Sequence, residues 1–420
     1  MPTILEQASL TVETKNWALV NHYLQQLPLE RKKPQLIKLS EPELNEAINI
    51  ALRVLRESNF QQRWEVAKTF PKLGTKTIEP LLEILHNETE NWETRWFAIN
   101  ILGRYSDPKV VIALIELLHN SDDEELLEPV TEALINIGSP AIKALSELLL
   151  EEEFRLLAVR SLAYIRRSET IQPLLTVIND PKPEIRAIAI EALGSFHNPQ
   201  IPPILIQALQ DETAQVRKEA VKALGIRAKQ LSQFDLVKYL SPLLYDLSWE
   251  VCKQTAIALG RLGNEAAGKA LFEVFQSPTT PDLLKIDIVR ALGWIATEKV
   301  LAYFQQALNQ SGVSVCQEII VTLGRISKPE LKPQAARILV HFFYSQQSYI
   351  EQPLIKQTLT TSLGFLGEKS AITLLTKLCQ DPEQATRLHA IAALKKIPQS
   401  SQDLLSAESL PPRISSAFIP

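Results

Sequence analysis

Apolar residues recur along this chain in paired helical stripes that are repeated almost from end to end. The segments PEIRAIAIEALG and AQVRKEAVKALG, which end at Gly194 and Gly225, have apolar residues at equivalent places. When the final glycine is numbered zero, positions −9, −5, −2 and −1 are apolar and share one face of a helix. Positions −10, −7 and −3 lie on the opposite face. The pattern therefore predicts an amphipathic helix with one buried side.

Position zero recurs at a nearly constant spacing, with most steps between 31 and 33 residues. Its occurrences are Pro71, Gly103, Ile135, Ala163, Gly194, Gly225, Gly260, Gly293, Gly324, Gly364 and Lys395. A shorter amphipathic helix precedes each copy and often opens at a proline, as at Pro108 and Pro140, where the missing N–H costs nothing. Neither helix of such a pair can bury its apolar face alone, so neighbouring pairs must stack. The pattern predicts an all-α solenoid of about eleven helix pairs without strands.

Length and composition further restrict the class of protein to which this chain can belong. A chain of 420 residues exceeds the usual size of one globular core, which agrees with a repeat array. The net charge of −4 disfavours nucleic acid as a partner, and three cysteines fit a reducing compartment. The start of the chain lacks the pattern of a signal peptide, and no apolar run is long enough to span a membrane. We expect a cytoplasmic protein with an N-terminal helical cap (1–45), a repeat solenoid (46–397) and a disordered tail (398–420).

The period, an aspartate followed six residues later by arginine, and the ALGxxG pattern at Gly260/Gly263 and Gly364/Gly367 resemble HEAT-like repeats. The resemblance is strongest to the short variety named after phycobilisome lyases and covers roughly residues 60–397. It implies a right-handed α-α superhelix whose second helices line a concave surface. The variety includes bilin lyases of the E/F type and proteins of phycobilisome turnover, so it also implies a phycobiliprotein partner if the chain is cyanobacterial. No catalytic motif of these proteins is matched here.

Position −8 of the second helix is basic in most units. The arginines at this position are Arg63, Arg95, Arg155, Arg186, Arg217 and Arg387. Three of them follow an aspartate by six residues, namely Asp180, Asp211 and Asp381, which are also placed to cap the helix. A row of arginines by itself suggests phosphate recognition. Because position −8 borders the apolar stripe, we instead predict a structural ladder of Asp–Arg pairs between stacked units.

The exposed face of the second helices changes character along the chain. In the N-terminal half it is acidic and includes Glu93, Glu125, Glu128 and Glu132, with Asp122 and Asp123 in a nearby loop. In the C-terminal half it is apolar, and the residues concerned are Leu283, Ile286, Val321, Leu354 and Leu388. Acidic residues can simply solvate a helix, but a contiguous apolar surface usually marks an interface. This face is the predicted partner-binding groove.

Aromatic residues give two further candidates. Trp64 and Trp96 share position −7 in the first two units, where they form either a contact hot spot or an edge covered by residues 1–45. A longer step between Gly324 and Gly364 contains the aromatic segment HFFYSQQSY. We expect this segment to pack beneath a longer loop, with a partner site as the alternative.

Candidate chemistry is sparse. Cys252 and Cys316 occupy position −8 two units apart, too far for a disulfide, and we expect small core residues rather than bilin-carrying or redox thiols. No histidine is followed by glutamate, so the His-Glu pairs of di-iron HEAT-like hydroxylases are absent.

We predict no catalytic, metal or cofactor-binding residue. The favoured function is a protein-binding scaffold or an assembly or regulatory factor. The alternative is a bilin lyase or a chaperone that handles bilins or phycobiliproteins.

Overall fold

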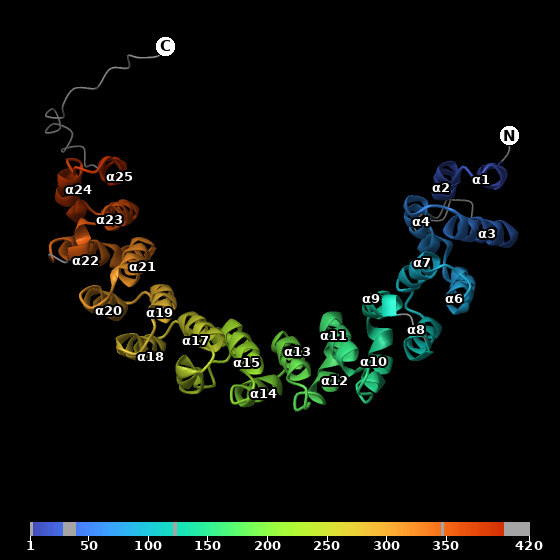
Figure 1. The fold of residues 1–420 in the computed structure, drawn as a ribbon, viewed down its shortest axis with the longest axis horizontal. Coiled ribbons are helices and arrows are strands. Elements are labelled where there is room, and N and C mark those ends of the chain that lie inside the picture. The colour runs from blue at the N-terminus through green and yellow to red at the C-terminus, as the bar shows by residue number, and fades with distance from the viewer. Residues whose placement is uncertain (1–2, 28–38, 121–123, 346–347, 399–420) are drawn as a thin grey trace, which may run out of the picture. The chain divides into compact units, whose positions relative to one another are not determined.

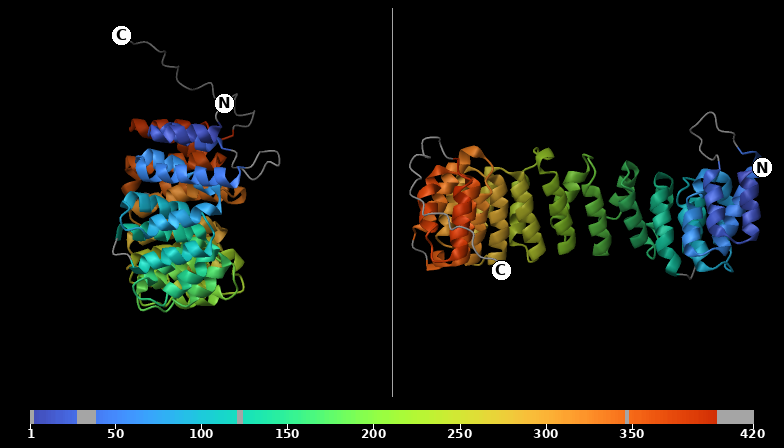
Figure 2. Two further views of the ribbon diagram at one scale, coloured as in Figure 1. Left: turned by 90° about the vertical axis from the view of Figure 1, so that its right-hand side faces the viewer. Right: turned by 90° about the horizontal axis from the view of Figure 1, so that it is seen from above.

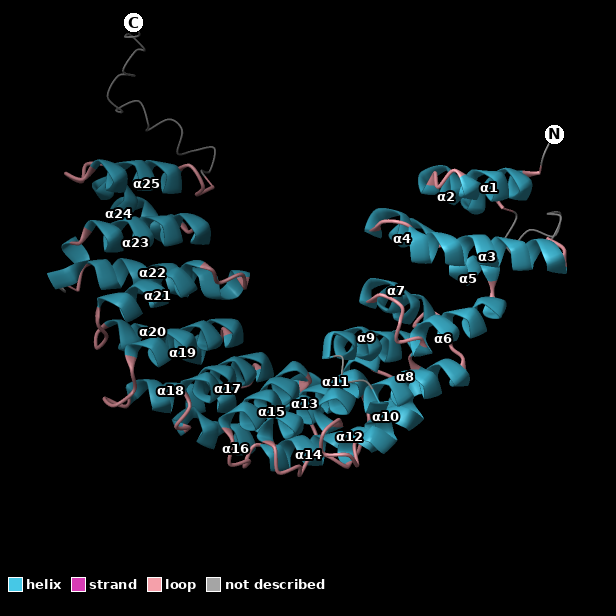
Figure 3. Cartoon of the chain, turned by 45° about the vertical axis from the view of Figure 1, so that its right-hand side comes forward, coloured by secondary structure: helices cyan, strands magenta, loops and turns pink. Residues whose placement is uncertain are grey.

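The computed structural model describes residues 3–27, 39–120, 124–345 and 348–398. Every regular element of this part of the chain is a helix, as Figure 3 shows, so the prediction of an all-α fold without strands is confirmed. The chain divides into two compact units, Met1–His197 and Asn198–Pro420. The predicted acidic residues Asp122 and Asp123, and the predicted tail beyond 398, lie outside the described residues.

The Met1–His197 unit contains two N-terminal helices followed by stacked helix pairs. Its helices are α1 (Ile4–Glu13), α2 (Trp17–Gln26), α3 (Glu41–Glu57), α4 (Phe60–Ala67), α5 (Phe70–Leu73), α6 (Ile78–His86), α7 (Trp92–Leu102), α8 (Pro108–Asn120), α9 (Leu127–Ile137), α10 (Ile142–Leu148), α11 (Arg155–Ile165), α12 (Ile171–Leu175) and α13 (Pro183–Gly194). The second helices α7, α9, α11 and α13 form one layer, and the first helices α6, α8, α10 and α12 form the other (Figure 1).

The Asn198–Pro420 unit repeats the same two layers. Its helices are α14 (Ile201–Ala208), α15 (Ala214–Ile226), α16 (Leu236–Leu240), α17 (Trp249–Leu262), α18 (Glu265–Gln276), α19 (Asp282–Ile295), α20 (Glu298–Leu308), α21 (Val313–Gly324), α22 (Lys332–Phe343), α23 (Pro353–Leu366), α24 (Ile372–Leu378) and α25 (Gln384–Leu394). The second helices α15, α17, α19, α21, α23 and α25 each pack on the next, side by side (Figure 2).

The glycine at position zero sets the spacing between successive second helices. A Cβ on Gly225 would lie 2.7 Å from the Cβ of Ala258, which is position −2 of the following unit. A Cβ on Gly103 would lie 2.8 Å from the Cα of Ala133. We call this close contact between the glycine at position zero and position −2 of the next second helix a glycine seat. It recurs at Gly260, Gly293, Gly324 and Gly364. Only glycine allows this approach without displacing the neighbouring helix.

The apolar stripe read from the sequence forms the core of the stack. Val216, Ala220 and Leu224 of α15 are buried, as are Ile185 and Leu193 of α13. The second glycines of the ALGxxG pattern, Gly263 and Gly367, have positive φ angles of 70° and 71° and end α17 and α23. A left-handed residue of this kind is a common end for a helix and directs the chain back to the next pair.

Candidate functional site

The predicted apolar row lies on the second helices of the Asn198–Pro420 unit. Leu283 on α19, Leu354 on α23 and Leu388 on α25 are 67%, 54% and 59% exposed. Ile286 and Val321 are half-buried, since successive second helices stand only about 10 Å apart and partly cover each other's inner faces. The row is thus an accessible apolar surface with two partly covered members.

Two large exposed apolar residues belong to the same surface but escaped the sequence reading. Trp294 and Phe365 are 56% and 58% exposed, and both occupy position +1, directly after Gly293 and Gly364. Position +1 continues the exposed stripe from −3 by one helical turn. The sequence carries this signal, although the exposed positions −10, −7 and −3 do not include position +1.

A hollow of about 330 Å³ lies among α21, α23 and α25. Val321, Leu354 and Phe365 supply its apolar lining, and Arg325 and His389 supply its basic groups. The ring of His389 is held in place, because its Nδ1 lies 2.9 Å from the hydroxyl of Thr361. The apolar row therefore includes a shallow recess that can receive a side chain of a partner.

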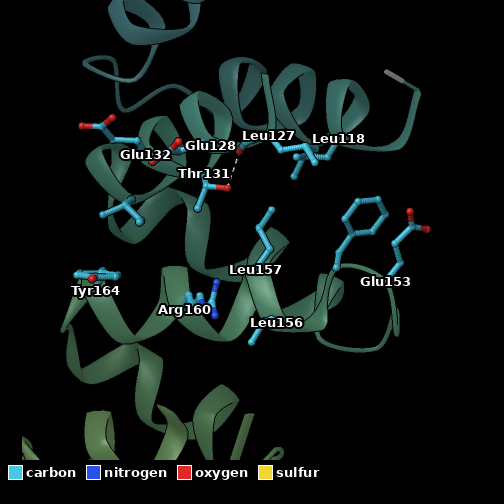
Figure 4. A pocket seen from close by; sticks show the side chains of 12 residues that line it. Leu118, Leu127, Glu128, Thr131, Glu132, Glu153, Leu156, Leu157, Arg160 and Tyr164 are labelled. Carbon is cyan, nitrogen blue, oxygen red and sulfur yellow. Dashed lines mark hydrogen bonds between the residues drawn. The ribbon is translucent and has the colours of Figure 1, made fainter. Parts of the chain in front are cut away.

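The predicted acidic residues lie in the Met1–His197 unit and play different parts. Glu93 forms an ion pair with Arg63, so its charge is already balanced. Glu125, Glu128 and Glu132 are exposed, and the last two line an open cavity of about 980 Å³ between α9 and α11. Figure 4 shows this cavity with the two glutamates on the α9 side and Arg160 and Tyr164 on the α11 side.

Trp64 and Trp96 lie in an aromatic cluster centred on Phe60. The ring of Phe60 is 6.4 Å from Trp64, 6.3 Å from Trp96 and 5.3 Å from Phe97, centre to centre. The N-terminal helix α2 reaches the same helix α4 through Asn21, whose amide donates to the carbonyl of Gln62 at 2.9 Å. Trp64 nevertheless remains 46% exposed, so the N-terminal helices do not cover it.

Ion pairs connect the residue at position −8 of one repeat to the next repeat, and we call each such pair a rung of the ladder. The cations at position −8 contact the aspartate at position −14 of the following unit in the pairs Arg155–Asp180 (3.1 Å), Arg217–Asp246 (2.7 and 2.8 Å) and Lys356–Asp381 (3.0 Å). Asp246 was missed from the sequence because its own unit has Cys252, not arginine, six residues later. Arg95 and Asp211 are half-buried at the equivalent places of their units.

The same side chains also bind backbone at the start of their own units. The guanidinium groups of Arg186, Arg217 and Arg387 donate to the carbonyl oxygens of Asp180, Asp211 and Asp381 at 2.7–2.8 Å. The aspartates do not act as the predicted helix caps. Their Oδ1 atoms accept instead from loop N–H groups two residues on, as Asp180 does from Lys182. This turn directs the second carboxylate oxygen toward the cation of the preceding unit.

In the pair Arg217–Asp246, burial and hydrogen bonding shift the pKa values in opposite directions. Burial would raise the pKa of Asp246, but the hydrogen bonds from Arg217 and from the N–H of Ser248 outweigh it and lower the pKa. The hydrogen bonds that Arg217 donates to Asp246 raise the pKa of Arg217, and burial opposes this shift. Both groups are therefore charged at neutral pH, and the arginines of this ladder are occupied by protein oxygens.

The cysteines are buried or half-buried thiols. Cys252 and Cys316 are buried free thiols, and the Sγ of Cys252 donates to the carbonyl of Asp246 at 3.1 Å. Cys252 thus makes the backbone contact that arginine makes in other units. Burial raises the pKa of all three thiols, that of half-buried Cys379 included, which lowers the thiolate fraction that nucleophilic chemistry needs.

The aromatic segment that begins in the last turn of α22 mainly contributes to packing. Phe342 is buried, and the hydroxyl of Tyr349 donates to the carbonyl of Leu308 at 3.3 Å and lies 3.4 Å from the Sγ of Cys316. Tyr344 is 50% exposed and lies beneath the ammonium of Lys377.

Within the described ranges, no cluster of histidine, cysteine or acidic residues could hold a metal ion. Nor does any described helix have the length and apolar character needed to cross a bilayer.

Comparison with known proteins agrees with this architecture. The family model for HEAT repeats matches residues 48–135, 78–154, 142–225 and 201–286. These overlapping matches cover more than half of the chain, which therefore belongs to the HEAT-repeat proteins. The matches name HEAT repeats in general and do not single out the phycobilisome-lyase variety. No curated protein matches the sequence.

Solved structures with a similar fold include the karyopherin Kap121p and importin beta. Kap121p bound to Nup53p is similar over 96% of this chain and 50% of its own, with 14% identity and a TM-score of 0.58. Importin beta in a polyethylene glycol condition is similar over 94% of this chain and 67% of its own, with 14% identity and a TM-score of 0.51. The chain spans about half the length of Kap121p. At these identities the likeness shows the fold alone.

Proposed function

We propose that this chain is a protein-binding scaffold or an assembly or regulatory factor, and that a partner protein binds the apolar row of the Asn198–Pro420 unit. The observation that carries the proposal is the exposure of Leu283, Leu354 and Leu388 on three second helices of one layer. Large aliphatic side chains exposed along one surface are costly in water and usually mark an interface. Trp294 and Phe365 add the aromatic side chains that dominate binding energy at interfaces.

The solved structures support the class of function without identifying the partner. In one of the similar structures Kap121p is bound to Nup53p, so a solenoid of this fold can hold another protein. The ionic ladder, the glycine seats and the buried cysteines of this chain all serve the stack itself. The exposed layer of second helices remains for binding.

The test compares capture of partners by matched variants. Leu354→Glu with Leu388→Glu places two charges in the row, and both side chains are already more than half exposed, so folding is retained. The control is Leu247→Glu, a fully exposed loop leucine of the same unit. Each tagged protein is incubated with lysate of the native cell, and captured proteins are quantified by mass spectrometry.

Proteins captured by the wild type and by Leu247→Glu should be lost from the double variant, because a charge buried against an apolar partner is stranded. The proposal fails if the double variant is folded, as judged by circular dichroism, and captures the same proteins in the same amounts. That result would exclude the apolar row as the binding surface.

A further inference from the structure

From α7 to α25, every other pair of successive second helices has a glycine at position zero or an ionic rung, but the α9–α11 interface has neither. At position zero of the α9 unit, Ile135 replaces the glycine that elsewhere seats the next helix. At position −8, Leu127 replaces the cation, and at position −14 of the following unit Leu149 replaces the aspartate. Glycine permits a close approach that isoleucine does not, so α9 and α11 pack without a glycine seat.

The open cavity of about 980 Å³ described above lies at this interface. Leu118 and Leu127 line one side, and Leu157 lines the other (Figure 4). Phe154 supplies an aromatic wall, held edge-on against His119 with the ring centres 5.1 Å apart. Ile135, which stands at the place of the glycine, also lines the space. We call this space the α9–α11 groove.

The charges around the groove are strongly unbalanced. Glu128, Glu132 and Glu153 line it, and none forms an ion pair with any residue in the described part of the chain. The one cation of the lining, Arg160, is already paired with Glu184 of the next unit. The groove thus combines an apolar floor with three carboxylates whose charge is left uncompensated.

We propose that the α9–α11 groove binds a basic amphipathic segment of another protein, with aliphatic or aromatic side chains on the leucine floor and lysine or arginine side chains against Glu128, Glu132 and Glu153. An amphipathic helix laid in a hydrophobic groove is a common mode of peptide recognition. The rim charges add specificity and speed the association of a positively charged segment. The same carboxylates repel nucleic acids and anionic lipids. This inference goes beyond the proposed function, because it concerns a different surface and names the chemistry of its occupant.

The direct test uses fluorescence anisotropy with synthetic peptides on the full chain. The probe is a fluorescein-labelled peptide that carries leucines at helical spacing with lysines on both flanks. One comparison peptide replaces every lysine by glutamate, and another replaces every leucine by serine. The proposal requires binding of the first peptide, weakened by added salt, and no binding of the other two. Equal binding of the glutamate peptide, or no binding of the lysine–leucine peptide, would overturn it.

A matched pair of charge variants locates the binding. Glu128→Gln with Glu132→Gln should weaken the dissociation constant of the lysine–leucine peptide on the order of tenfold, as two rim ion pairs together contribute. Glu83→Gln with Glu147→Gln removes the same charge from exposed first-helix positions of the same unit and should leave binding unchanged. Equal losses in both variants would mean that net charge alone attracts the peptide, and the groove would be excluded.

A second pair of variants tests the origin of the groove. Ile135→Gly restores the glycine seat and should let α9 and α11 close, which abolishes peptide binding. Ala163→Gly introduces the same helix-weakening residue at position zero of the next unit, outside the groove lining, and should bind as the wild type does. Unchanged binding by a folded Ile135→Gly variant would overturn the proposal. None of these variants touches the apolar row, so its test and this one fail independently.

Discussion

The guanidinium of Arg217 holds the carboxylate of Asp246 in a two-pronged contact, with Nε–Oδ2 and Nη2–Oδ1 distances of 2.7 and 2.8 Å. The two side chains are only 14% and 8% exposed, and they join successive second-helix units. Another guanidinium nitrogen of Arg217 donates to the backbone of its own unit at Asp211. One side chain thus fixes both the start of its own helix and the register of the next unit.

Asp246→Asn should therefore cost about 3 kcal/mol of the free energy of unfolding at neutral pH, because it leaves Arg217 with an uncompensated buried charge. Pairing lowers the pKa of Asp246 in the folded state, so its contribution is complete above the ordinary aspartate pKa of about 4 and is lost as the pH falls below it. Urea unfolding at a series of pH values measures both effects. In the variant, the loss of stability on acidification should be smaller.

The control for this variant is Asp282→Asn, since Asp282 is exposed on α19 of the Asn198–Pro420 unit. It should retain the stability and the acid response of the wild type. If Asp246→Asn retains them too, Arg217 and Asp246 are not a stabilising pair.

Arg186→Ala tests the phosphate-binding alternative. Arg186 is 6% exposed, and its guanidinium donates to the carbonyl oxygens of Asp180 and Pro181. Removing it should destabilise the protein by about 2–4 kcal/mol, because buried backbone acceptors lose charged donors. The exposed Arg104 gives the control, Arg104→Ala. A variant at Arg186 that melts like the wild type but loses its partner would make the arginines a ligand site.

Two glycines of the Asn198–Pro420 unit, Gly225 on α15 and Gly268 on α18, should respond to alanine in opposite directions. Gly225→Ala would place a Cβ 2.7 Å from Ala258, and the overpacking should cost about 1–3 kcal/mol, more than the gain in helix propensity. Around Gly268 of α18 the nearest atom would be Ile295 Cδ1 at 3.6 Å, an ordinary contact. Gly268→Ala should therefore stabilise by about 0.5–1 kcal/mol. Thermal melting distinguishes the two, and equal shifts would contradict the glycine seat.

Cys252→Ser and Cys316→Ser should leave folding and partner capture intact. In each case the serine hydroxyl can donate to the carbonyl now contacted by sulfur, at Asp246 and at Ser311. Mixing the wild type with a bilin should also leave the bilin absorbance spectrum unchanged. A spectral shift that disappears in either cysteine variant would instead favour the bilin lyase hypothesis.

The stack was predictable from sequence because each unit repeats the same local information. The apolar stripe fixes the buried face of α15, and the ALGxxG pattern fixes the left-handed ends at Gly263 and Gly367. Asp246 could not be singled out in the same way, because its own repeat has Cys252 rather than arginine six residues later. The half-burial of Ile286 and Val321 likewise depends on neighbouring helices, which a single helical stripe does not describe.

The groove was also visible only after folding. Its acidic residues could be read as one exposed face, but the meaning of Ile135 and Leu127 depends on what glycine and arginine do at the same positions of other units. Once the glycine seat is known, an isoleucine at position zero identifies an open interface.

The missing seat and rung between α9 and α11 have a mechanical consequence. The stability of a repeat array is close to a sum over its units and the interfaces between them, so its cooperativity breaks first at the weakest interface. Backbone amides of α9 and α11 should exchange with solvent faster than those of α7, whose Gly103 is seated on Ala133. A segment lodged there would bridge the two helices and slow that exchange. Occupancy of the groove could therefore be measured as a decrease in local backbone opening of α9 and α11.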